Sequence, residues 1–306
     1  MKLGTFEKFL WSHHCDVLLA ARFHMFHGFQ SFIRLLEMAT ETPSLDSLRT
    51  CLLDLSQPIA KRTQAAFYLR TDGSDVAMQI ICEALLQRED SSLMRHELAY
   101  ILGQIQKNGA CAVLSSILDD ETEDLLVRHE SAEALGAIGQ SASLPLLVKY
   151  STHHSPEIAE TCQIAIDLIS WNIDHASPET HKSLYLSHDP APPLSSIESQ
   201  SIEYLLSILL DPTQRLFVRY QAMFSLRDKN TDDAALALVR GLEDSSALFR
   251  HEIAFVLGQM QRKVSAPGIL KLYSILLFSV SSVANCILLL LFVLCVRFNS
   301  YTFQGI

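Results

Sequence analysis

Residues 92–104 read SLMRHELAYILGQ and residues 247–259 read ALFRHEIAFVLGQ, and the two stretches are identical at eight of thirteen positions. In both, apolar residues recur every three or four positions, which is the period of one face of an α-helix. A third stretch, VRHESAEALGAIG at 127–139, has the same frame and places His129 33 residues after His96. That spacing is typical of a repeated helical hairpin. The sequence therefore predicts an all-α fold, an α-solenoid of HEAT-like hairpins.

The repeat also predicts two halves, because the stretch at 247–259 begins 155 residues after its near-copy at 92–104. We expect an N-terminal HEAT-like half at 44–171 and a C-terminal HEAT-like half at 199–270, joined by a linker at 172–198 that contains HDPAPP. Residues 1–43 match no repeat and form an N-terminal extension, and 271–306 form an apolar tail that leaves the second half incomplete. Helices are expected at 56–70, 74–87, 91–105, 109–118, 123–138, 142–150, 156–171, 199–210, 213–227, 231–242 and 246–261.

Within the tail, residues 272–296 contain no charged side chain. A helix of that length spans about 37 Å, more than the roughly 30 Å of a bilayer's hydrocarbon layer. We therefore expect a C-terminal apolar helix that is long enough to be a transmembrane helix. This leaves a tail-anchored protein facing the cytosol as the alternative to a cytoplasmic one.

The cysteine content and the net charge indicate which cellular compartment and which classes of partner to expect. The seven cysteines are odd in number and form no CxxC pair, which favours free thiols in a reducing compartment and a cytoplasmic location. The formal net charge is −10. Nucleic-acid binders need a basic face, so no nucleic-acid partner is expected, whereas a basic protein partner would suit this charge.

The repeated polar residues are the three pairs His96-Glu97, His129-Glu130 and His251-Glu252. Imidazole and carboxylate together are ligands for iron, manganese or zinc. Adjacent residues on a helix point about 100° apart, so both can border one groove, and stacking brings the next pair alongside. We therefore expect a metal site and take all six residues as candidate ligands. Two histidines and one Glu could bind an ion directly, and another Glu would then support a ligand or contact the substrate. The alternative is a set of solvated surface pairs.

An arginine precedes each of these histidines, at positions 95, 128 and 250. Two interpretations remain open from the sequence: the arginines form structural ion pairs, or they contact the substrate.

Five segments resemble deoxyhypusine hydroxylase, and the resemblance runs from about residue 44 to residue 270. It implies a non-haem dinuclear iron monooxygenase that uses O2 to hydroxylate the deoxyhypusine side chain of eukaryotic translation initiation factor five-A, in hypusine biosynthesis. The segments are RHELAYILGQ at 95–104, VRHESAEALGAIG at 127–139, AETCQIAIDLISW at 159–171, HDPAPP at 188–193 and SALFRHEIAFVLGQMQ at 246–261.

The resemblance also implies residue roles. His96, His129 and Glu130 would bind Fe(2+) directly, and Glu97 would lie near the substrate amine. The second half should repeat this arrangement with His251, Glu252 and a fourth pair.

The fourth pair is absent, because the 33-residue step from His251 reaches Ala284, which is followed by Asn285. Of the family's two iron ions, we expect at most one to be well ligated here, and we expect weak or no activity. We interpret the tail as a product of truncation or mis-splicing in preference to a membrane-anchored relative. The competing hypotheses are a metal-free HEAT-repeat scaffold and a membrane-anchored binding protein.

Overall fold

The computed structural model describes residues 43–175, 185, 187–195 and 201–277, and all regular structure in these residues is helical. The predicted all-α fold is therefore confirmed for the described part of the chain. The helices of the first half are α3 Leu45–Leu53, α4 Ile59–Asp72, α5 Asp75–Leu85, α6 Ser92–Ile105, α7 Cys111–Asp119, α8 Leu125–Ile138, α9 Leu144–Tyr150 and α10 Pro156–Asp174. Those of the second half are α11 Ile202–Leu209, α12 Leu216–Lys229, α13 Asp232–Arg240, α14 Ala247–Met260 and α15 Ala266–Leu277.

Each helix expected from the sequence is present, with its ends shifted by a few residues. Helix α3 is not predicted, because it lies at the margin of the repeat, where the pattern has no second copy to compare with. Helix α15 overlaps the start of the apolar helix expected at 272–296. Helix α15 contains the first six residues of the apolar stretch, and 278–296 lie outside the described residues, as do 1–42 of the N-terminal extension. Among the helices that the structure describes, none is both long enough and apolar enough to cross a membrane.

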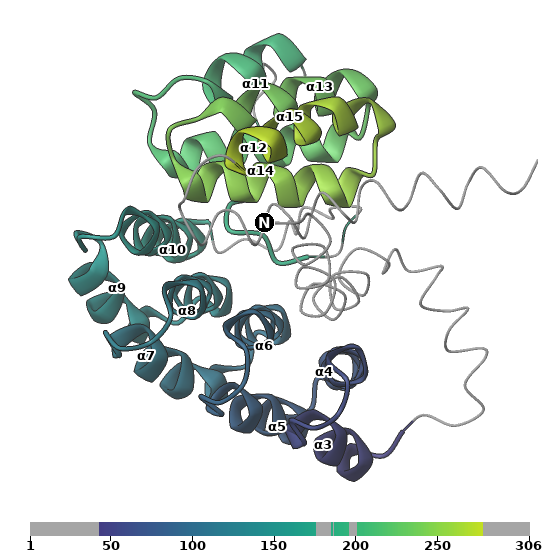
Figure 1. Cartoon of the computed structure of the whole chain (residues 1–306). Helices are drawn as coiled ribbons and strands as arrows, with labels where there is room; N and C mark the ends of the chain where they lie inside the picture. The colour runs from purple at the N-terminus through teal and green to yellow at the C-terminus, as the bar shows by residue number, and fades with distance from the viewer. Residues whose placement is uncertain (1–42, 176–184, 186, 196–200, 278–306) are drawn as a thin grey trace, which may run out of the picture.

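The first half is an arc with two layers of helices. Helices α3, α5, α7 and α9 form the outer layer, and α4, α6, α8 and α10 line the concave side (Figure 1). The second half lies across this concave side with α14 towards the first half, and α10 contacts both α12 and α14. The concave surface, where a solenoid usually binds its ligands, is therefore enclosed between the two halves.

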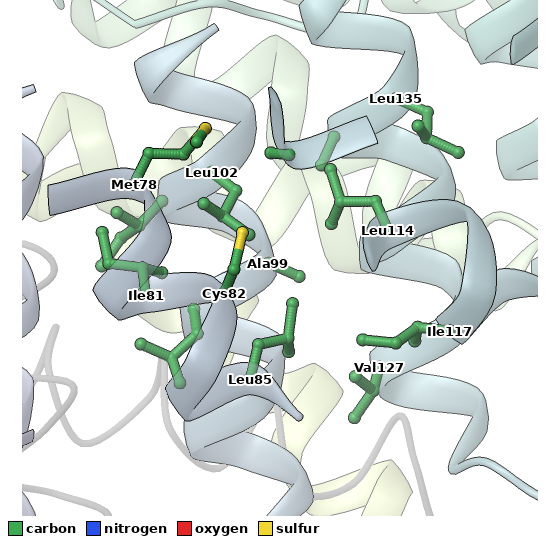
Figure 2. Packing of buried hydrophobic residues seen from close by; sticks show 14 of the residues in the cluster. Met78, Ile81, Cys82, Leu85, Ala99, Leu102, Leu114, Ile117, Val127 and Leu135 are labelled. Carbon is green, nitrogen blue, oxygen red and sulfur yellow. The ribbon is translucent and has the colours of Figure 1, made fainter. Parts of the chain in front are cut away.

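Apolar side chains fill the space between the two layers. Figure 2 shows Met78, Ile81 and Leu85 of α5 packed with residues of α6, α7 and α8 in one continuous cluster. The inner helices approach one another closely at two glycines. A Cβ at Gly103 would lie 3.0 Å from the Cα of Ala134, and one at Gly136 would lie 2.8 Å from the Cβ of Ala165. These contacts set the short distances from α6 to α8 and from α8 to α10.

A buried arginine joins each of the helices α4, α6, α8 and α12 to the helix before it. The Nε of Arg62, Arg95, Arg128 and Arg219 donates a hydrogen bond to the main-chain carbonyl ten residues earlier, at 2.9, 2.9, 3.1 and 2.9 Å respectively. The guanidinium groups of Arg62 and Arg95 also form ion pairs with Asp90 at 2.5 Å and Glu123 at 2.6 Å. Of the two interpretations that the sequence left open, the structural ion pair therefore applies to Arg95. Arg128 makes a structural hydrogen bond to a main-chain carbonyl and forms no ion pair among the described residues.

Arg250 departs from this pattern, although it precedes a histidine as Arg95 does. Its Nη1 donates to the carbonyls of Asp244 and Ser245 at 2.5 and 3.0 Å, in the turn just before its own helix. The repeat is thus exact in sequence at this position, while the local structure differs.

The buried ion pair of the first hairpin gives a test of this arrangement. Arg62→Met removes the partner of Asp90 while both side chains are about 95% buried, and the uncompensated charge should lower the free energy of unfolding by about 3–5 kcal/mol. The matched control is Arg49→Met, which breaks the exposed ion pair with Glu83 and should cost less than about 1 kcal/mol. Urea denaturation measures both. Equal losses in the two variants would contradict the structural role of the buried arginine.

Candidate metal centre

Three imidazole rings meet between the two halves of the protein. His96 lies on α6, His129 on α8 and His251 on α14. The ring centroids are 5.3 Å apart for His96 and His129, 6.4 Å for His96 and His251, and 6.0 Å for His129 and His251. One ring nitrogen of each lies within 4.8 Å of the others. Residues 155 positions apart in sequence are therefore brought to one point.

The repeat explains why these helices present the same residue to the same place. Arg95 and Arg128 are held by the outer layer, so the next residue on each helix, turned by about 100°, faces the concave side. Helix α14 comes from the opposite direction. Tyr100 and Phe255, which occupy equivalent positions in the two near-copies, meet with their ring centroids 6.2 Å apart. Equivalent faces of α6 and α14 thus look towards each other.

Glu130 supplies a carboxylate to this cluster. Its Oε2 lies 2.9 Å from Nε2 of His96 and 3.9 Å from Nε2 of His129, and all three side chains are about 90% buried or more. Burial alone would lower the pKa of His96, but the negative charge of Glu130 outweighs it and raises that pKa. Burial lowers the pKa of His129 well below its usual value, and the neighbouring rings of His96 and His251 add to this effect. His129 is therefore a neutral imidazole with a lone pair.

The donor set suits a transition-metal cation. The Nδ1 atoms of His96 and His129 are buried, and neither has a hydrogen-bond partner among the described residues. Three imidazole nitrogens and one carboxylate oxygen are ligands that iron, manganese and zinc accept. The sequence predicted His96, His129, Glu130 and His251 as ligands. The structure groups the three histidines, and Glu130 lies beside His96 and His129.

The two glutamates expected to act on the substrate lie beside this cluster. Among the described residues, Glu97 and Glu252 belong to neither group of close metal-ligand atoms, so their roles stay predictions. Glu97 is half-buried, and its charge contributes to the raised pKa of His96. Glu252 is buried, and burial, together with the negative charges of Glu130 and Asp189, raises its pKa to about 8.

Sequence reasoning missed one carboxylate, that of Glu133. It follows His129 by one helical turn on α8, and its carboxylate forms a second close group with His129 and Glu130, again within 4.8 Å. Burial raises the pKa of Glu133 well above its usual value, and the charges of Glu130 and Glu252 raise it further. The i, i+4 spacing in VRHESAE contains this signal, but the repeated His-Glu pairs that predict the metal site are adjacent residues and do not include Glu133.

The linker fastens the two halves together. The side-chain amide of Gln104 on α6 donates to the carbonyl of His188 and accepts from its N–H, both at 3.0 Å. The next residue, Asp189, accepts two hydrogen bonds at 2.8 and 2.6 Å from Arg227 on α12, which is fully buried. We call these contacts of Gln104, His188, Asp189 and Arg227 the linker clasp. In the linker clasp, His188 is bonded to the first half and Asp189 to the second, so the linker connects the two halves by hydrogen bonds as well as by the chain.

A HEAT-repeat family model matches residues 83–167. Deoxyhypusine hydroxylase of Bos taurus is 45% identical over 230 residues, which cover 75% of this chain and 74% of the relative. The enzyme of the same name from Candida albicans is 44% identical over 249 residues, covering 77% and 78%. The solved structure of human deoxyhypusine hydroxylase in complex with glycerol superposes with a TM-score of 0.73 at 35% identity, covering 83% of this chain and 96% of the human one.

The chain belongs to the deoxyhypusine hydroxylase family.

The resemblance seen in the sequence is thus confirmed. In this member of the deoxyhypusine hydroxylase family, three His-Glu pairs lie within the described residues, at 96–97, 129–130 and 251–252. Residues 284 and 285, where the sequence repeat would place a fourth pair, lie outside the described residues.

The raised pKa of Glu252 predicts a pH-dependent stability of the metal-free protein. An ordinary glutamate pKa is near 4.5 and that of Glu252 is about 8, so the folded state holds this proton more tightly. The resulting stabilisation is complete below about pH 4.5 and is lost as the pH rises through about 8. Glu252→Gln removes the titration and should flatten the fall in unfolding free energy between about pH 6 and 8 by up to about 1.4 kcal/mol per pH unit.

Denaturant unfolding of chelator-treated protein measures this slope. His96, His129 and Glu133 titrate in both proteins. Because the charge of Glu252 also raises the pKa of Glu133, the difference in slope reports Glu252 together with its effect on Glu133. Identical slopes in the two proteins would show that the folded state does not hold the Glu252 proton.

The linker clasp predicts a second effect on stability. Asp189→Asn removes the charge that faces the buried guanidinium of Arg227, and losing a charged hydrogen bond should cost about 1.5–3 kcal/mol of unfolding free energy. Asp233→Asn, an exposed change in the same half, is the control and should cost less than about 0.5 kcal/mol. Thermal and urea denaturation compare them. Equal unfolding free energies for the Asp189→Asn and Asp233→Asn variants would show that the linker clasp does not stabilise the fold.

Proposed function

We propose that this chain is a deoxyhypusine monooxygenase, which hydroxylates the deoxyhypusine side chain of eukaryotic translation initiation factor five-A with O2 and iron. One observation carries the proposal. In a chain 45% identical to the Bos taurus enzyme of that name, His96, His129 and Glu130 gather at one buried point. These are the residues that the family resemblance assigns to direct iron binding in the first half.

The chain's own residues prepare this point for a cation. The neutral ring of His129 offers a lone pair without first losing a proton, and Glu130 supplies negative charge to the same space. Bound iron would supply the dioxygen activation that amino-acid side chains lack. The burial of His96, His129 and Glu130 limits the access of water to them, which strengthens the electrostatic contacts among them.

Further carboxylates would bind and orient the substrate. Glu97, Glu133 and Glu252 surround the histidines, and the first two are half-buried, so solvent reaches them. The raised pKa values of Glu133 and Glu252 mean that this site disfavours their negative forms, and the cationic amine of a deoxyhypusine side chain would stabilise those forms. The net charge of −10 also favours the approach of a basic protein partner. The roles of Glu97 and Glu252 in amine binding are part of the proposal.

Reduced activity is the expected consequence of the missing pair. The resemblance assigns two ions to the family, and the second half of this chain has a single histidine to offer, His251. Losing even the outer partners of metal ligands typically costs 10–100-fold, so turnover should be at least about 100-fold slower than that of the human relative.

The test uses the full chain loaded anaerobically with Fe(II), then given O2 and the deoxyhypusine-bearing factor. Mass spectrometry should detect a substrate that has gained one oxygen atom. His129→Ala should abolish this gain because it removes the neutral ligand, whereas the exposed His154→Ala should not change it. The human relative, assayed alongside, sets the reference rate.

Complete absence of oxygen transfer by the iron-loaded chain would contradict the proposal. The scaffold hypothesis makes the opposite prediction: the factor would still bind to a Glu97→Ala, Glu130→Ala variant, and no condition would yield hydroxylated product.

A further inference from the structure

We propose that this chain binds one metal ion shared between its two halves, with His96, His129 and Glu130 of the first half and His251 of the second as ligands. The family resemblance implies instead one ion for each half. The inference rests on the metal site of the proposed function, but not on hydroxylation. It can therefore be tested apart from activity.

The separations of the ring nitrogens favour a single ion. Three points that all lie within 4.8 Å of one another share a centre no more than 4.8 Å divided by √3, or about 2.8 Å, from each. Bonds from zinc to imidazole nitrogen are about 2.0–2.1 Å, and iron forms bonds of similar length. Each ring therefore needs to move by less than about 1 Å to reach an ion at the common centre. Side-chain rotation supplies such a shift without moving the helices.

The orientation of the rings is consistent with the same conclusion. The ring of His251 is nearly perpendicular to both others, at 80° to His96 and 85° to His129. It therefore approaches the common centre from its own side and does not stack on either ring. Glu130 already reaches the first two histidines at 2.9 and 3.9 Å. The set thus offers three nitrogens around one centre and a carboxylate oxygen beside two of the three rings.

The second half has little with which to hold an ion of its own. His251 is the only histidine among residues 201–277, the part of the second half that the structure describes. Asp189, the carboxylate that the linker brings nearby, is already engaged by both terminal nitrogens of Arg227. One imidazole cannot hold a divalent ion against water. Sharing the ion of the first half uses His251 in the position where the structure puts it.

A shared ion also relieves a charge imbalance. Glu130, Glu133 and Glu252 lie close enough for their charges to influence one another, and Arg227 is the cation that offsets them at Glu252. A divalent cation among the histidines would be attracted by the same carboxylates. Its ligands come from α6, α8 and α14, so binding would tie the halves together in addition to the linker clasp.

The experiment titrates the full metal-free chain with Co(II), whose visible absorption reports the number of nitrogen donors. Elemental analysis after anaerobic loading with Fe(II) gives the stoichiometry. We expect one equivalent of metal. His251→Ala and the more conservative His251→Gln should each weaken Co(II) affinity at least about 10-fold and change the absorption spectrum. His154→Ala, an exposed histidine of the first half, should change neither.

Circular dichroism verifies that each variant remains helical. Two equivalents of metal, no bound metal, or one equivalent whose affinity and spectrum are the same in both His251 variants would each overturn the shared site. One equivalent of metal that depends on His251, without any hydroxylation, would contradict the proposed function and support the shared ion. Hydroxylation with two bound ions would do the reverse.

Discussion

The geometry of this protein depends on the buried arginines that join its inner and outer helices. A guanidinium cannot be left unpaired inside a protein without a large loss of solvation energy. Arg95 and Arg128 therefore have few alternatives to the carbonyls of Leu85 and Leu118. Once the arginine is held, its helix cannot rotate, and the following histidine is directed into the concave side. The metal-binding residues are thus oriented by the residues just before them.

A second constraint acts between the halves. The linker clasp connects Gln104 to residue 188, 84 positions away, and Arg227 to residue 189, 38 positions away. The hydroxyl of Ser246 adds a hydrogen bond of 2.6 Å to Glu160, between α14 and α10. These contacts keep the second half over the concave surface. The candidate metal centre is therefore a property of the interface, because neither half alone contains all three imidazoles.

The same interface concentrates negative charge. Glu130, Glu133, Glu252 and Asp189 lie near one another. Burial is the main cause of the raised pKa values of Glu133 and Glu252, and the neighbouring negative charges raise them further. Such repulsion weakens the folded state in the absence of a counter-charge. It is typical of sites that bind a cation or a cationic substrate. The close carboxylates thus both lower the stability of the fold and enable it to bind a cation. The buried ion pairs and the apolar cluster of the first half offset this loss of stability.

The sequence by itself determined the helical fold, the hairpin repeat and the four side chains that meet at the cluster, because helical period and repeat spacing are local properties of a chain. It did not decide whether Arg95 and Arg128 served structure or substrate, and it did not reveal Glu133. Nor could it show that His251 approaches the same point as His96 and His129. Those features depend on how helices rotate and how the halves face each other. Contacts between residues far apart in sequence, chiefly the clasp and the inter-half packing, fix that orientation, and no local pattern encodes it.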